Sequence, residues 1–337
     1  MQSTSAGLMV LLVAGIMNAS FTLPMKFTRK WAWENTWAVW SVFALLIFPP
    51  IVTLATVPNL SEVYAQAGTG IIAAVAAFGA GWGIAQVFFG LAVESIGIAL
   101  AFSIILGIAA AVGSLIPLIQ LHSDKAFTGP GLGVFAGVAL VLVGVSVCAV
   151  AGRRREAALG VGPKGQSFGR GLTFAILSGL GAALTNFGMA YGGPLMKAAE
   201  ATGTPLHWRP NAAWLPLMMA GSIANLAYCI YLMKKNRTTQ RFGETGTGSY
   251  WFLAGLMAFF WFASTLLYGV STVKLGELGA VIAWPLFMSL IVITASVLGI
   301  RTGEWKGSGT KPLRVMYAGI AVLIAAVVVL SMANRAM

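Results

Sequence analysis

The chain consists of long apolar stretches separated by short polar gaps, and this pattern limits its fold more than any other feature. Several stretches carry no charge over more than the ~20 residues that a helix needs to cross a bilayer. Because no water reaches the backbone there, only helices and closed β-barrels can satisfy its hydrogen bonds. The runs are continuous rather than alternating, which favours helices over barrel strands. We therefore expect an all-α integral membrane protein.

Composition supports this expectation. Of the 337 residues, 58% are hydrophobic and 9% are charged, whereas a soluble chain carries roughly 25% charged residues. The net charge of +12 comes from basic residues in the gaps between apolar runs. We interpret them as determinants of topology and expect no nucleic-acid partner. Cys148 and Cys229 lie inside apolar runs, so we expect no disulfide, metal site or cofactor.

The hydropathy pattern predicts ten transmembrane helices. They fall near residues 4–24, 36–57, 70–93, 96–119, 131–151, 170–191, 211–233, 250–272, 276–299 and 313–333. The N-terminal segment lacks the basic region of a signal peptide, so we expect it to remain as the first span. The gaps at Glu94–Ser95 and at residues 273–275 are very short, which predicts tight helical hairpins at these two places.

The distribution of basic residues predicts the orientation of the spans. Sixteen of the 21 Lys and Arg residues fall in the odd-numbered loops, and five fall in the even-numbered loops and the termini. Cytoplasmic loops are enriched in Lys and Arg. The odd-numbered loops should therefore lie in the cytoplasm and both termini outside it.

An internal repeat divides the chain. Four residues recur after 179 positions: Trp82, Gly90, Gly97 and Ala101 match Trp261, Gly269, Gly276 and Ala280. Four more recur after 164 positions: Gly7, Leu8, Gly15 and Met25 match Gly171, Leu172, Gly179 and Met189. The repeated unit holds five spans, an odd number, so the second copy must be inverted in the membrane. We expect halves at 1–151 and 171–337, joined by a cytoplasmic linker at 152–170.

Inverted repeats around a midplane site are a recurrent plan of secondary transporters, because two near-equivalent halves can exchange inward-open and outward-open forms. A duplicated channel or membrane enzyme would also fit a repeat. The chain has only His122 and His207 as histidines, and it contains neither an H-E-x-x-H pair nor a G-x-S-x-G elbow, so we expect no enzyme. Saturable uptake with counterflow would separate a carrier from a channel.

Three stretches also carry a family resemblance. The first comprises Phe21, Pro24, Lys26, Lys30, Trp31, Trp33 and Glu34; the second comprises Phe78-Gly79-Ala80, Trp82-Gly83-Ile84 and Gly90-Leu91; the third comprises Glu304-Trp305, Pro312 and Met332-Ala333-Asn334. In these stretches the chain resembles the bacterial L-rhamnose–proton symporter family of the drug/metabolite transporter superfamily, over essentially its whole length.

This resemblance implies two inverted five-helix repeats, the drug/metabolite transporter fold, in a bacterial cytoplasmic membrane. It also implies import of a neutral monosaccharide, L-rhamnose or a related deoxyhexose, by proton symport with alternating access. The partners are then the sugar, protons and lipid, and the protein is a monomer or a homodimer. The alternative is a metabolite or drug exporter of the same superfamily, although such exporters usually carry an acidic residue deep in the membrane for cationic substrates.

A neutral sugar needs an aromatic face for its C–H surface and uncharged polar groups for its hydroxyls. The expected substrate-binding residues are Asn18, Trp82, Gln86, Asn186, Trp261, Thr265, Tyr268 and Trp284. Trp82 and Gln86 are four residues apart and share a helix face. The repeat maps this pair onto Trp261 and Thr265, which should face it across a pseudo-twofold axis.

Two further features of the spans bear on mechanism. Pro285 follows Trp284 and is our preferred helix kink, and Gly79 and Gly83 predict close helix packing.

The ninth span begins with Glu277-Leu278-Gly279-Ala280, where the symporter family carries a polar run with Gln, Tyr and Asp. Glu277 lies one helical turn from the position of that Asp, so it is our candidate for proton coupling.

Overall fold

The computed structural model describes residues 4–161 and 168–335, and within these ranges the chain is helical and contains no strand. Ten helical segments are long and apolar enough to cross a membrane, which confirms the predicted spans. Residues 162–167 of the expected linker lie outside the described residues.

Six of the described spans are single helices, and four combine consecutive segments. In chain order the spans are α1 Thr4–Ser20 with η1 Leu23–Phe27; α2 Trp33–Ser41, η2 Val42–Ile47 and α3 Phe48–Thr56; α5 Thr69–Ile96; α6 Ile98–Leu121; α8 Gly129–Leu159; α9 Phe168–Tyr191 with α10 Gly193–Ala201; η3 Leu206–Trp208 and α11 Asn211–Asn236; α12 Gly248–Leu275; α13 Gly279–Arg301; and α14 Thr310–Arg335. Outside the spans lie α4 Leu60–Ala67, α7 Ser123–Ala126 and η4 Thr239–Gly243.

The two helical hairpins exist, but their predicted turns were wrong by a few residues. Helix α5 includes Glu94–Ser95, and helix α12 continues to Leu275. The chain reverses instead at Gly97 and Gly276, whose φ angles are 82° and 89°. Only glycine adopts such angles readily, whereas charged side chains are tolerated in the last turn of a helix. The two glycines are a matched pair of the 179-residue repeat.

Helix α8 extends past its predicted end and continues to Leu159, so Arg153, Arg154 and Arg155 lie on the helix rather than in a linker. Glu156 is buried there and accepts a hydrogen bond from the backbone N–H of Ala99 (3.2 Å). The first part of the segment expected as a linker therefore packs against the start of α6.

Helices that the repeat makes equivalent pack in equivalent ways. Helix α5 lies against α9 and α11, and helix α12 lies correspondingly against α1 and α2. Gly7 lies against Leu275, and its repeat partner Gly171 lies against Ile96. This is the pattern expected of halves related by a pseudo-twofold axis, while the division at 1–151 and 171–337 stays a prediction.

Close packing between α5 and α11 places the central tryptophan of α5. A Cβ atom on Gly79 would lie 2.0 Å from the carbonyl oxygen of Leu217, and one on Gly83 would lie 2.3 Å from that of Gly221. Both positions therefore require glycine, as the small-residue spacing predicted. The contact brings Gly221 against the ring of Trp82.

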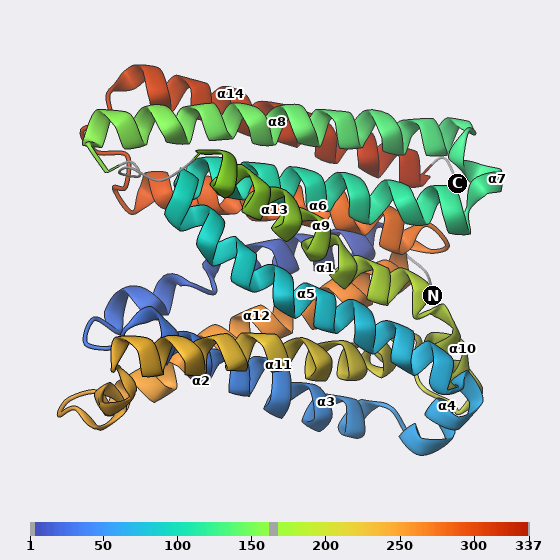
Figure 1. Cartoon of the computed structure of the whole chain (residues 1–337). Coiled ribbons are helices and arrows are strands. Elements are labelled where there is room, and N and C mark those ends of the chain that lie inside the picture. Colours follow the sequence, from blue (N-terminus) through green and yellow to red (C-terminus); the bar gives the residue numbers. More distant parts are fainter. Residues whose placement is uncertain (1–3, 162–167, 336–337) are drawn as a thin grey trace.

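The connections separate into two groups at opposite ends of the bundle (Figure 1). The end at which α1 begins and α14 ends also holds α4, α7 and α10. The segment between α1 and α2, η4 and the α13–α14 connection lie at the other end. Odd-numbered and even-numbered loops thus lie apart, so the excess of basic residues is concentrated at one end of the molecule.

Three of the described helices contain an interior proline, and in each case a side chain of a neighbouring helix replaces the lost hydrogen bond. The residues are Pro117 in α6, Pro216 in α11 and Pro285 in α13. Proline has no N–H, so the carbonyl four residues earlier loses its helical partner. Each of these carbonyls accepts a side-chain hydrogen bond instead: Gly113 from Asn186 (2.7 Å), Ala212 from Tyr64 (3.1 Å) and Val281 from Ser114 (2.6 Å). Pro285, our preferred kink, is thus one of three equivalent cases.

This arrangement predicts an interaction between Ser114 and Pro285. Ser114→Ala should destabilise the protein by about 1 kcal/mol, because it leaves the buried carbonyl of Val281 unpaired. In a Pro285→Ala background residue 285 regains an N–H for that carbonyl, so Ser114→Ala should cost much less. Denaturant unfolding of the four proteins in detergent measures the difference, and an equal cost in both backgrounds would contradict the account.

Candidate functional site

Two tryptophans meet near the middle of the bundle. Trp82 lies half-way along α5 and Trp261 half-way along α12. Their rings stack with centroids 5.6 Å apart and an interplanar angle of 19°. Trp82 is 4% exposed, while Trp261 is half-buried. The two residues expected to face each other across the halves are therefore in contact.

The aromatic contacts continue from this pair along α2. Trp40 lies edge-on to Trp261, with centroids 5.1 Å apart. Trp37 lies 4.5 Å from Trp40, and Trp33 stacks on Trp37 at 5.0 Å. Trp37 and Trp40 were not among the predicted site residues, although the spacing of four and three residues along Trp33, Trp37 and Trp40 places them on one helix face.

The helix changes its geometry immediately after these aromatic residues. The π-helical segment η2 begins at Val42, and Pro49 and Pro50 follow in α3. Short π-helical segments within α-helices frequently accompany functional sites. The second span is therefore irregular where it borders the stacked pair.

Neutral polar side chains connect the helices around the aromatic residues. The Asn18 amide of α1 donates to the Ser264 hydroxyl of α12 (2.9 Å). The Trp37 indole donates to the Asn225 carbonyl oxygen of α11 (3.3 Å). This arrangement suits a site for an uncharged polar solute, because an isolated charge is costly at this depth.

Asn186 joins four helices in a second cluster. Its amide donates to the carbonyl oxygens of Gly113 (2.7 Å) and Ala280 (3.1 Å), and its side-chain oxygen accepts the Tyr268 hydroxyl. The Tyr268 ring in turn packs edge-on against Trp284 at 5.6 Å. Tyr268 lies two turns beyond Trp261 along α12, so this cluster lies on the side of the stacked pair toward Leu275.

The predicted residues therefore fall into two groups. The residues Asn18, Trp82 and Trp261 lie around the stacked pair, and Asn186, Tyr268 and Trp284 form the second cluster. Gln86 is half-buried one turn along α5 from Trp82. The Thr265 hydroxyl donates to the carbonyl of Trp261 in its own helix (3.1 Å).

Glu277 lies outside the apolar part of the bundle, in the turn between α12 and α13. Its side chain is 64% exposed and forms an ion pair with Lys125, while His122 Nδ1 lies 3.8 Å away. The hydrogen bond from Lys125 holds the pKa of the Glu277 carboxyl below its ordinary value of 4.5. Burial lowers the pKa of His122. These groups connect the α12–α13 turn to the α6–α7 turn.

A second ionic cluster lies at the opposite end of α13. Lys26 Nζ donates to Glu304 Oε1 (2.8 Å), and Arg155 Nε donates to the Glu304 backbone carbonyl (2.7 Å). The guanidinium of Arg155 also lies over the ring of Trp305, 5.7 Å from its centroid. Helix α13 is thus connected to neighbouring segments by carboxylates beyond both of its ends.

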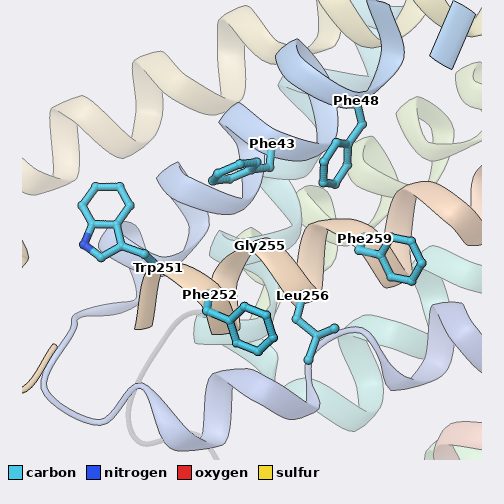
Figure 2. A pocket seen from close by; sticks show the side chains of 7 residues that line it. All are labelled: Phe43, Phe48, Trp251, Phe252, Gly255, Leu256 and Phe259. Atoms are coloured by element: carbon cyan, nitrogen blue, oxygen red, sulfur yellow. The ribbon is translucent and has the colours of Figure 1, made fainter. Parts of the chain in front are cut away.

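A groove on the side of the bundle is of a different kind (Figure 2). It has a volume of about 440 Å³ and is lined by Phe43, Phe48, Trp251, Phe252, Gly255, Leu256 and Phe259. Phe252 and Phe259 are exposed, and the lining side chains provide no hydroxyl, amide or charge for a polar solute. Within the described ranges, no group of three or more His, Cys, Asp or Glu residues is placed to hold a metal ion.

The Lys125–Glu277 pair predicts a pH dependence of stability. Because the folded-state pKa of Glu277 is lowered, the pair stabilises the protein above about pH 4.5 and is lost as the pH falls further. Lys125→Gln should lower the melting temperature by at most about 2 °C at pH 6, since exposed pairs contribute little. The two proteins should melt alike at pH 3. A difference that persists at pH 3 would contradict this.

Comparisons with known proteins cover almost the whole chain. The family model described as L-rhamnose-proton symport protein (RhaT) matches residues 2–334. The L-rhamnose-proton symporter of Mannheimia succiniciproducens is 30% identical over 329 residues, which cover 94% of each chain. The L-rhamnose-proton symporter of Yersinia pestis is 28% identical over the same length and the same shares.

Proposed function

This chain belongs to the L-rhamnose-proton symport protein family, and we propose that it imports L-rhamnose or a related deoxyhexose together with a proton. The family match over residues 2–334 and the ten spans support proton-coupled sugar import by secondary active transport. Export of metabolites or drugs is not favoured by the family. The membrane is the bacterial cytoplasmic membrane, with the basic loops in the cytoplasm and both termini in the periplasm.

The stacked pair of Trp82 and Trp261 is the observation that supports the location of the site. A pyranose ring has an apolar C–H face that packs on an indole, and it carries hydroxyls around its edge. In the proposed site the sugar packs on the half-buried Trp261 and replaces its contact with Trp82. Asn18, Gln86 and Thr265 lie on α1, α5 and α12 and supply uncharged groups for the hydroxyls.

The Asn186 cluster serves in this proposal as the closure on the periplasmic side. Asn186, Tyr268 and Trp284 connect α6, α9, α12 and α13, so the cluster must separate for a sugar to enter from that side. The ionic clusters at Glu277 and Glu304 lie at opposite ends of α13. In the proposed mechanism, one of these ionic clusters separates in the outward-open state and the other separates in the inward-open state. Glu277 is the proposed proton-coupling group, because it is the carboxylate at the periplasmic end of α13.

Uptake by the purified protein tests this function. Proteoliposomes with an imposed pH gradient, acidic outside, should accumulate L-rhamnose or another deoxyhexose from a monosaccharide panel, and a protonophore should abolish the accumulation. Preloaded sugar should support counterflow, which a channel cannot do. If no sugar is transported, while amino acids or amphipathic cations are, the proposed function is wrong.

The aromatic platform predicts a loss of sugar affinity in Trp82→Ala and Trp261→Ala. Each should raise the KM for the transported sugar at least tenfold, because a loss of about 1.4 kcal/mol of binding free energy corresponds to a factor of ten. Trp251→Ala, in the lateral groove, is the matched control and should leave the KM within about twofold. A normal KM in both central variants would place the sugar elsewhere.

Proton coupling predicts a selective defect in Glu277→Gln. The amide that replaces the carboxylate still accepts a hydrogen bond from Lys125, but it cannot take up and release a proton. Uptake driven by the pH gradient should therefore be lost while counterflow persists. Glu200→Gln is the control, because Glu200 is also exposed and pairs with Arg209 (2.8 Å). Unchanged gradient-driven uptake in Glu277→Gln would remove Glu277 from the coupling mechanism.

A further inference from the structure

Trp40 carries a buried donor that nothing in the described part of the chain uses. Its side chain is 1% exposed, and its Nε1 has no hydrogen-bond partner among the described residues. An indole nitrogen can only donate. A buried donor without a partner costs about 1–3 kcal/mol, so a group of this kind calls for a physical explanation.

Two other buried indoles of the spans do have partners. Trp37 donates to Asn225 (3.3 Å), and Trp284 donates to the carbonyl oxygen of Ala109 (2.7 Å). Partners are thus available to buried indoles when they are needed. Trp214 also lacks a partner for its Nε1 among the described residues, but of these two only Trp40 lies against Trp261 of the stacked pair.

The surroundings of Trp40 are aromatic on three sides. Its ring centroid lies 4.5 Å from that of Trp37, 5.1 Å from that of Trp261 and 6.0 Å from that of Phe21. The edge-on contact with Trp261 provides at most a weak N–H···π interaction. The next residue, Ser41, has a buried hydroxyl that also has no partner within the described chain. Because consecutive residues of a helix point to different faces, it is Trp40 whose ring lies against the stacked pair.

The position of Trp40 connects it with the proposed site. Trp40 touches Trp261, the half-buried member of the stacked pair, and the helix becomes π-helical two residues later. A ligand that packs on Trp261 would come within reach of the edge of Trp40. Such a ligand needs an apolar face for the rings and a neutral acceptor for the indole N–H, which is the combination that a pyranose offers.

We propose that the Trp40 indole N–H donates a hydrogen bond to one hydroxyl of the bound sugar, which makes Trp40 a specificity-determining residue. This inference rests on the proposed function and adds a residue that the sequence analysis did not select. A site with a buried donor rejects an analogue that lacks the acceptor, because the donor is then left unpaired. Trp40 thus selects for a hydroxyl at one ring position.

The proposed hydrogen bond from Trp40 to the sugar is tested by combining one variant with a set of sugar analogues. Affinities of wild type and Trp40→Phe are measured for the transported sugar and for its analogues that each lack one hydroxyl. Wild type should bind one analogue at least tenfold more weakly than the parent sugar. In Trp40→Phe, which keeps an aromatic ring without a donor, the parent and that analogue should bind within about twofold of each other.

Trp214→Phe is the matched control. Trp214 is also 1% exposed with an unpaired Nε1, but its Nε1 lies against Gly269 and its ring lies 6.2 Å from that of Tyr268 rather than against Trp261. This variant should keep the wild-type discrimination between analogues. An equal loss for every sugar in Trp40→Phe, or wild-type discrimination in that variant, overturns the inference. Failure of wild type to bind any sugar overturns the proposed function instead.

A spectroscopic measurement covers the case in which Trp40→Phe does not fold. The wild-type protein labelled with ¹⁵N-tryptophan is titrated with the transported sugar, and the Trp40 indole resonance is assigned with a Trp40→Tyr variant or by paramagnetic relaxation from a label on α2. The indole proton should move downfield on binding and become protected from solvent exchange. An unshifted Trp40 resonance at saturating sugar overturns the inference.

Discussion

The absence of water inside the bilayer is the constraint on which the rest of this structure depends. Every backbone group freed from its helix must find a partner within the protein, and the three interior prolines each free a carbonyl. Side chains from α9, α4 and α6 supply these partners, so the irregular helices are connected to their neighbours by neutral hydrogen bonds. Asn186 illustrates the result, since the residue that compensates Pro117 also binds Ala280 and Tyr268.

The same constraint shapes the proposed site. Charges are confined to the ends of the helices, where Glu277 and Glu304 form ion pairs, and the middle of the bundle offers indole rings, amides and hydroxyls. These groups suit a solute that is polar but uncharged. In the proposed mechanism the proton acts through Glu277 at one end of α13, and the sugar binds at the aromatic middle of the bundle.

Much of this arrangement follows from the sequence, because hydropathy and the 179-residue repeat are regular signals. They predicted the ten spans and the meeting of Trp82 with Trp261. The hairpin turns were misplaced, because charge was taken as the end of a helix where the backbone required glycine at positions 97 and 276. The partners of the freed carbonyls could not be predicted, because they lie 73, 148 and 167 residues away in the chain. Trp40 was missed because its proposed role rests on an indole Nε1 without a hydrogen-bond partner, and only the packing of the helices reveals this.

The location of bound sugar tests the central claim most directly. A structure of the full chain in lipid nanodiscs with saturating L-rhamnose, or with the deoxyhexose that it transports, would show where the pyranose ring lies. The account predicts the ring in van der Waals contact with Trp261, with the Trp82–Trp261 centroid distance increased beyond 5.6 Å. Sugar bound elsewhere, for example in the lateral groove of Figure 2, with the two indoles still stacked, would contradict it.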